Sequence, residues 1–308
     1  MTGSFSPARL ALSRRERQKL ITGLLFISPW IIGFLAFLAY PILYSAYLSF
    51  TEIKGFGASI ETNWVGLENY RYMMRDNLFW KSLYNTIYYT VLAVPIGLGV
   101  AITLALAMNQ KLREIPLYRA AFYLPSVLPT FAVSLVFVWL LNPRYGLVNL
   151  ALGLFGVANI NWFGDPAYSK LAIVILAQLG AGQYALIFLA SMRGIPQTLY
   201  DAAEIDGASA WHKFWNITLP LITPVILYDL IVGLGFGLQV FEQAYITTNG
   251  GPADSTLFYV FYLYNNAFRY NQMGYAAAQS WLLFLISISL AGVLFWWSKR
   301  WVNYEVSA

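Results

Sequence analysis

Six long apolar runs constrain the fold of this chain more than any other feature of its sequence. They cover about residues 20–50, 83–108, 120–141, 170–192, 219–241 and 275–297. Roughly 20 apolar residues in a helix cross the hydrocarbon core of a bilayer, so each run is long enough for a transmembrane helix. Hydrophobic residues make up 59% of the 308 residues and charged residues only 11%, whereas soluble proteins carry roughly 25% charged residues. The sequence therefore predicts an all-α membrane protein with six transmembrane helices.

Prolines are expected to bend two of these runs. The first run follows a basic tail, 1–19, and is too long for the core of a signal peptide. Pro29 and Pro41 lie inside it and are expected to bend it. Pro125 and Pro129 lie near the start of the third run, where they predict a break or kink. The polar segment 51–82 is expected to be a loop with a short helical part.

The distribution of Lys and Arg predicts which side of the membrane each end occupies. Six spans place both termini on one side, and residues 20–298 then form one membrane domain. If the termini are inside, the inner segments hold 12 of the 19 basic residues and the outer loops hold 7. Because cytoplasmic loops are richer in Lys and Arg, the tails 1–19 and 299–308 and the polar segment 193–218 are predicted to be cytoplasmic. The basic residues lie at span ends rather than in one stripe, so membrane lipid is an expected partner and nucleic acid is not.

The side-chain inventory excludes several kinds of chemistry. The chain has no Cys and one His, His212, which leaves no basis for a thiolate or His-rich metal site. No Gly-x-x-x-x-Gly-Lys-Ser/Thr loop is present, so ATP is not expected to bind in that manner. A membrane enzyme would need several catalytic groups at one depth, and the sequence offers no such cluster. We predict a chain without enzymatic activity, metal or cofactor of its own.

The polar segment 193–218, between the fourth and fifth apolar runs, has the pattern of a helical hairpin. Gln197 follows a proline that can open a helix, and Gly207 suits the left-handed residue that ends one, which predicts a helix over 197–205. Ser209 is a candidate N-cap for a second helix. The segment is therefore expected to form a bent hairpin outside the lipid.

This hairpin resembles the EAA signature of permease subunits of binding-protein-dependent ABC importers. The three parts of the signature appear in order as Asp201-Ala202-Ala203, Asp206-Gly207-Ala208 and Ile217-Thr218-Leu219-Pro220, with Asp201 in place of the usual Glu. Further motifs resemble the carbohydrate branch of these permeases, which includes maltose, oligosaccharide and glycerol-3-phosphate permeases. They are Ser28-Pro29-Trp30, Tyr40-Pro41, Val65–Tyr70, Asn85-Thr86 and Asn249–Pro252.

The resemblance implies a type I importer fold, the MetI-like permease arrangement, with the second to sixth spans as its core. It implies two ATP-binding cassette subunits that bind ATP and Mg, a second homologous permease, and an extracytoplasmic sugar-binding protein as partners. It also implies the cytoplasmic membrane of a bacterium or archaeon. The hairpin would then couple to the ATPase through Tyr200, Asp201, Ala202, Ala203, Glu204, Asp206, Gly207 and Ala208. The acids are candidates for ion pairs with ATPase arginines or for capping, and a solvated acidic face is the alternative for Glu204.

Polar groups inside the spans predict the path of the solute, because burying them in lipid is costly. Amides offer donors and acceptors to sugar hydroxyls, aromatic faces pack on sugar C–H surfaces, and maltose-type permeases hold the sugar against these spans. The predicted lining is Gln178, Gly180, Gln183, Tyr184, Gly233, Phe236, Gly237 and Gln239. Close helix packing is the alternative for the glycines.

An ion-gradient-driven secondary transporter of a polar solute is the alternative function. It would need membrane-buried charges for ion coupling. Asp229 is the only carboxylate well inside a predicted span, and Glu242 lies near an outer end. Either could steer a cationic substrate or relay protons, and an interhelical hydrogen bond explains them equally well. The resemblance implies instead an ATP-driven importer of a di- or oligosaccharide.

Overall fold

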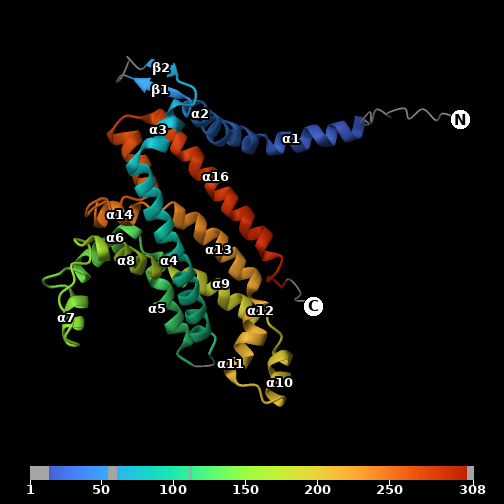
Figure 1. Ribbon diagram of the computed structural model, residues 1–308. Helices are drawn as coiled ribbons and strands as arrows, with labels where there is room; N and C mark the ends of the chain where they lie inside the picture. Colours follow the sequence, from blue (N-terminus) through green and yellow to red (C-terminus); the bar gives the residue numbers. More distant parts are fainter. Residues whose placement is uncertain (1–13, 55–60, 111–112, 304–308) are drawn as a thin grey trace.

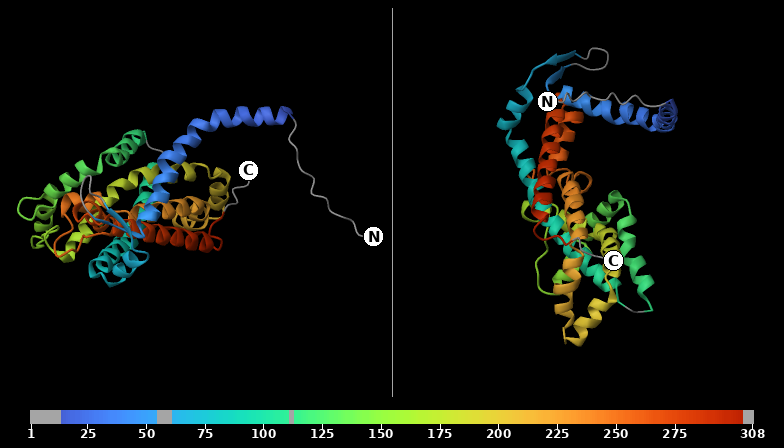
Figure 2. Two further views of the ribbon diagram at one scale, coloured as in Figure 1. Left: turned by 90° about the horizontal axis from the view of Figure 1, so that it is seen from above. Right: turned by 90° about the vertical axis from the view of Figure 1, so that its right-hand side faces the viewer.

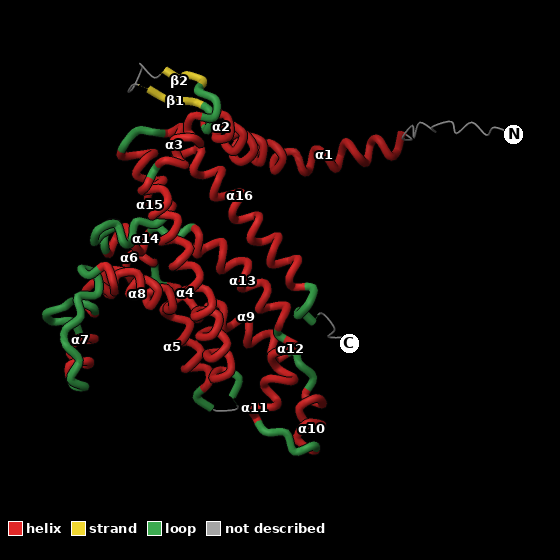
Figure 3. The backbone as a smooth tube through the Cα atoms, in the orientation of Figure 1, coloured by secondary structure: helices red, strands yellow, loops and turns green. Residues whose placement is uncertain are grey.

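The computed structural model describes residues 14–54, 61–110 and 113–303 and shows a bundle of helices with one small sheet (Figure 1). Residues 1–13 and 304–308 of the two predicted tails lie outside the described residues. The described chain has five helices apolar and long enough to cross a membrane, or up to six if one bent pair is a single span. Strands occur only at one end of the described bundle (Figure 3). The all-α class is thus confirmed for the membrane part.

The first apolar run forms a bent helix that leaves the bundle. It consists of α1 (Arg14–Phe34), a π-helical turn (Leu35–Ala39) and α2 (Tyr40–Leu48). The π-helical turn ends two residues before Pro41, whose missing N–H and bulky ring disturb the regular hydrogen bonding of the preceding turn. Figure 2 shows α1 outside the bundle, and no residue of the most apolar 18-residue stretch of this span is buried. The α2 end packs against the bundle, on α16.

The segment predicted as a polar loop contains a sheet that sequence analysis missed. Strands β1 (Thr51–Lys54) and β2 (Glu61–Trp64) pair antiparallel, and the short helix α3 (Glu68–Arg75) follows. The second span, α4 (Asn77–Met108), begins earlier than predicted because Asp76 caps it: its Oδ1 accepts a hydrogen bond from the Leu78 amide at 2.9 Å.

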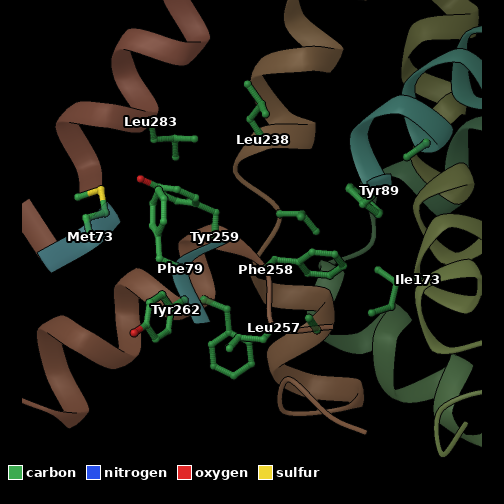
Figure 4. Close-up of a cluster of buried hydrophobic side chains, with 14 of the residues drawn as sticks. Met73, Phe79, Tyr89, Ile173, Leu238, Leu257, Phe258, Tyr259, Tyr262 and Leu283 are labelled. Carbon is green, nitrogen blue, oxygen red and sulfur yellow. The ribbon is translucent and has the colours of Figure 1, made fainter. Parts of the chain in front are cut away.

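Helix α4 organises two apolar cores. The core nearer the sheet joins α4 to α15 (Tyr259–Tyr264) and α16 (Met273–Ser298), and it is drawn in Figure 4. Its largest fully buried side chains are aromatic, namely Phe79, Phe258, Tyr259 and Phe261. The other core, nearer the opposite end, packs Ala101 and Ala105 of α4 against Phe188 and Met192. The small alanines let α9 (Ala181–Arg193) approach α4 closely.

The third apolar run is broken at Pro129, one of the two prolines for which a break or kink was predicted, whereas Pro125 lies inside a helix. Helices α5 (Ile115–Val127) and α6 (Thr130–Leu140) meet at an angle of 98°, with Leu128 in extended backbone. Pro129 has no N–H to continue the ladder and disfavours a helical conformation at the residue before it. Helix α5 also begins before the predicted start of the third run at about residue 120. A further helix, α7 (Leu147–Gly153), lies in the predicted loop after α6.

The remaining spans lie where the sequence predicts them. Helix α8 (Pro166–Ala177), a 3-10 turn (Gln178–Gly180) and α9 form the fourth span. The fifth combines α13 (Thr223–Leu238) with α14 (Glu242–Thr247) across a break at Gln239. The sixth is α16, and α15 with a π-helical turn (Asn265–Arg269) is an additional helical segment before it.

Candidate functional site

The polar segment folds into the predicted helical hairpin at the end of the bundle away from the sheet (Figure 1). Helix α10 (Gln197–Ile205) ends two residues before Gly207, whose φ is +76°. The amide of Ala208 donates to the Ala203 carbonyl at 2.8 Å, which closes the helix in the left-handed manner that glycine allows. Helix α11 (Ala210–Lys213) then begins at the predicted cap, Ser209, whose Oγ accepts from the His212 amide at 3.3 Å.

Side chains tie the two arms of the hairpin together. Lys213 Nζ lies 3.2 Å from Glu204 Oε1. The hydroxyls of Tyr200 and Thr218 lie 2.9 Å apart. Glu204 therefore has a partner inside the hairpin, although an ion pair this exposed contributes only about 0–1 kcal/mol. The other two acids are exposed at the surface, with Asp201 accepting from Gln197 Nε2 at 3.1 Å.

The hairpin exposes several large apolar side chains, which sequence analysis missed. Ile205 is 88% exposed and Trp211 is 68% exposed, and Leu199 and Trp215 are also exposed. Exposed apolar side chains grouped in this way mark an interaction surface. The available signal was the spacing of Trp211 and Trp215, four residues apart on one helical face.

The base of the hairpin is fixed to two spans. Tyr200 and Ile217 pack against the core that contains Phe188 of α9 and Ile222 at the start of α13. The predicted start of the fifth run, at about residue 219, falls in the short helix α12 (Leu219–Leu221), which links the hairpin to α13. A displacement of the hairpin would therefore move α9 and α13.

None of the predicted solute-path residues lines either of two hollows found in the described part of the chain. Gln178 lies at the 3-10 turn and donates to the Val174 carbonyl at 2.7 Å, and its Oε1 has no partner among the described residues. Gln183 and Gln239 are exposed, and Tyr184 is half-buried beside the second core. A hollow of about 290 Å³ beside β1 and an apolar groove of about 740 Å³ along α6 are both lined by other residues.

The glycines of the predicted path have two different environments. A Cβ on Gly237 would lie 2.8 Å from Thr90 Cγ2, and one on Gly233 would lie 3.2 Å from Val94 Cγ1. These two glycines therefore bring α13 close to α4, the packing role given as their alternative. Gly180 has open space around it, and Phe236 is 70% exposed. The exposed members of the set lie on the surface that α4 does not cover.

The remaining candidates carry no catalytic arrangement. Asp229 is buried on α13, only 7% exposed, and Glu242 is exposed at the start of α14. No group of three or more His, Cys, Asp or Glu side chains suited to a metal ion occurs within residues 14–54, 61–110 and 113–303.

Comparison with known proteins shows the family to which this chain belongs. The family described as the inner membrane component of binding-protein-dependent transport systems matches residues 93–306, more than half of the chain. The probable ABC transporter permease protein YesP of Bacillus subtilis is 37% identical, with 99% of each chain covered. The lactose transport system permease protein LacF of Rhizobium radiobacter is 35% identical, with 95% of this chain and 99% of the relative covered.

A further relative and a solved structure agree with this result. The sulfoquinovosyl glycerol transport system permease protein SmoG of Agrobacterium fabrum is 31% identical over 89% of each chain. A chain in the crystal structure of a bacterial ABC transporter that imports the acidic polysaccharide alginate superposes with a TM-score of 0.78 at 24% identity. The superposition covers 93% of this chain and 97% of that one. The likeness to this structure concerns the fold, and it confirms the fold that the sequence resemblance implied.

Proposed function

Because this chain belongs to the family of inner membrane components of binding-protein-dependent transport systems, we infer that it is the permease subunit of an ATP-driven importer for a di- or oligosaccharide. Family membership makes it a membrane component of a transporter and not an enzyme. The single observation that carries the mechanism is the hairpin. It exposes large apolar side chains at the surface, and its base packs against α9 and the start of α13. An ion-gradient-driven transporter has no evident use for such a device.

The hairpin transmits the motion of a partner ATPase. Its exposed apolar face, with Ile205 and Trp211, enters a cleft on a nucleotide-binding subunit, and the acids Asp201 and Asp206 meet basic groups at the rim. A nine-residue helix such as α10 is about 13 Å long, which suits a surface groove. Because Tyr200 and Ile217 pack against α9 and the start of α13, closure of the ATPase dimer moves these spans together. ATP and Mg are bound by the partner subunits.

The solute passes on the side of α9 and α13 that α4 leaves open. Gly180, Gln183, Phe236 and Gln239 supply this chain's share of the lining, with Gln178 and Tyr184 beside them, while Gly233 and Gly237 hold α13 against α4. A second homologous permease supplies the other half. The most apolar stretch of the first span is not buried within this chain, which is consistent with such a partner.

A saccharide is the solute because the relatives named above carry lactose and sulfoquinovosyl glycerol, and others carry arabinooligosaccharides. An extracytoplasmic binding protein delivers it. In a solved neighbour of the same fold, the transporter is in complex with a periplasmic protein that holds an alginate pentasaccharide. The chain resides in the cytoplasmic membrane of a bacterium or archaeon, with its hairpin and both termini in the cytoplasm.

Reconstitution into liposomes tests the function. With the second permease, the ATPase and the binding protein present, ATP hydrolysis and saccharide uptake are expected to rise together, and omission of this chain should abolish both. The control is a mixture that lacks only the saccharide. Uptake by the purified chain alone under an ion gradient, without ATP, would contradict the proposal.

Labelling with a membrane-impermeant maleimide tests the orientation, since the chain has no Cys of its own. In inside-out vesicles stripped of the ATPase subunits, a Trp211→Cys variant at the exposed hairpin is expected to react, and it is expected to stay unlabelled in spheroplasts. Leu67→Cys, at an exposed position just before α3, is the matched control and should react in spheroplasts. Labelling of Trp211→Cys from outside would show that the chain is inverted.

A further inference from the structure

A lysine near the start of α8 is held by neutral groups alone. Lys170 Nζ lies 4.6 Å from the ring centre of Tyr88 and 5.1 Å from that of Tyr84. It also donates to Asn85 Oδ1 at 3.2 Å. None of the described carboxylates lies within salt-bridge distance of Lys170. The half-buried ammonium therefore keeps an uncompensated positive charge, and two of its three N–H groups have no hydrogen-bond partner among the described residues.

The neighbouring charges leave this excess in place. Lys81 lies one turn before Asn85 on α4, donates to the Ala253 carbonyl at 2.8 Å and pairs with Asp254 at 3.3 Å. Asn85 Nδ2 in turn donates to the Asp254 carbonyl at 2.8 Å. Lys81 and Asp254 neutralise each other. The cluster formed by Lys81, Asp254, Asn85, Lys170, Tyr84 and Tyr88 therefore has a net charge of +1, and that charge is on Lys170.

The two tyrosines belong to the face of α4 that the rest of the bundle leaves open. At about 100° per residue, Tyr84, Tyr88 and Val91 fall on one side of the helix. The opposite side carries the buried residues Thr86 and Thr90, and a Cβ on Gly237 of α13 would meet Thr90. Tyr84 is 61% exposed and Val91 is 62% exposed. The cluster thus lies on the side of α4 opposite its contact with α13, away from the proposed solute path.

An aromatic and apolar stripe on a spanning helix, with a lysine at its end, is typical of a lipid contact at headgroup level. We propose that Lys170, Tyr84 and Tyr88 bind the phosphate of an anionic phospholipid in the leaflet away from the α10–α11 hairpin. The phosphodiester carries one negative charge, which matches the net charge of the cluster. The free N–H groups of Lys170 donate to the phosphate oxygens, and an acyl chain lies along Ile87 and Val91, which are both exposed. The site fixes the outer ends of α4 and α8 relative to the membrane surface.

Native mass spectrometry of the assembled transporter tests this site. The delipidated complex is titrated with phosphatidylglycerol or with phosphatidylcholine, and the wild type is expected to retain the anionic lipid preferentially. Loss of a charge-assisted hydrogen bond predicts roughly tenfold weaker binding of phosphatidylglycerol in Lys170→Gln. Lys170→Arg should retain the lipid. Arg75→Gln, which removes an exposed cation of α3 outside the cluster, is the matched control and should not change binding.

Equal retention of phosphatidylglycerol by Lys170→Gln and the wild type would overturn the proposal. A second result would also overturn it: unchanged lipid binding, together with a higher half-saturation concentration for a carboxylated saccharide but not for a neutral one. That outcome would assign Lys170 to the solute. If Lys170→Gln does not assemble, Tyr84→Ala removes an exposed ring and leaves the ammonium in place. Weaker phosphatidylglycerol binding by Tyr84→Ala supports the site, and unchanged binding refutes it.

Discussion

Replacing Gly207 by Val is expected to abolish solute uptake while the chain still inserts into the membrane in normal amounts. Gly207 has a φ of +76°, and a Cβ at this position would have no other atom within 4 Å. The cost of a side chain there is therefore conformational rather than steric. The left-handed conformation costs roughly 1–2 kcal/mol for ordinary residues, and β-branched residues are the least suited to it. The strained turn would release the Ala208 to Ala203 hydrogen bond and change the angle between α10 and α11.

The matched variant for this experiment is Gly207→Asn, because Asn tolerates the left-handed region better than other side chains. Uptake of the saccharide is measured in whole cells, and the amount of each variant in the membrane fraction is measured by immunoblot. Gly207→Asn is expected to keep most of the uptake. Normal uptake by Gly207→Val would refute the coupling role of the hairpin, and equal loss in both variants would show that contact at this surface matters more than backbone conformation.

The hairpin was predictable because its signals are local. The residues that open, end and cap its helices all lie between Pro196 and Ser209, so each can be interpreted from its immediate neighbours. The break between α5 and α6 was predictable for the same reason, since Pro129 acts on its own backbone and on the residue before it. The apolar runs located the spans because membrane insertion depends on the composition of a single helix.

Contacts between distant segments were not predictable in this way. Asp76 had no special signal in the sequence, yet it caps α4 and its Oδ2 accepts from Tyr262 at 2.5 Å and Tyr275 at 2.7 Å. These tyrosines lie 186 and 199 residues further along the chain. Burial and the hydrogen bond to Asp76 raise the pKa of Tyr262 above that of a free phenol. The phenol therefore stays a hydrogen-bond donor across the physiological pH range.

The predicted solute path shows a second feature that the sequence alone does not reveal, namely the surroundings of a residue inside a span. Gly180 and Gly237 have the same side chain in the same apolar context, but only the structure separates the open position from the packed one. The Nε2 of Gln178 donates to the carbonyl of Val174 within the same span, and its Oε1 has no partner among the described residues, a division that the sequence does not show. A sequence pattern can mark a polar or small residue in a span without showing which neighbour it faces.

Replacing Gly274 by Ala is expected to destabilise the end of the bundle that carries the sheet. Gly274 is in the first turn of α16, and a Cβ there would lie only 1.8 Å from the backbone oxygen of Thr51 in β1. That oxygen also accepts from Asn69 Nδ2 at 2.9 Å, so β1 cannot move away without disturbing α3. Overpacking of this kind costs about 1–3 kcal/mol and occasionally more, and here the obstacle is backbone rather than a flexible side chain.

Gly292 in the same helix provides the matched control, because Ala at this position is expected to stabilise the protein rather than destabilise it. A Cβ at Gly292 would meet nothing within 4 Å, so Ala there gains helix propensity and stabilises by about 0.5–1 kcal/mol. The fraction of monodisperse protein that survives heating in detergent is measured for both variants. Gly274→Ala should lose monodispersity at a lower temperature than the wild type, and Gly292→Ala at the same or a higher one. If the two variants behaved alike, the effect would reflect glycine in a membrane helix generally, and the close approach of α16 to β1 would not explain the need for Gly274.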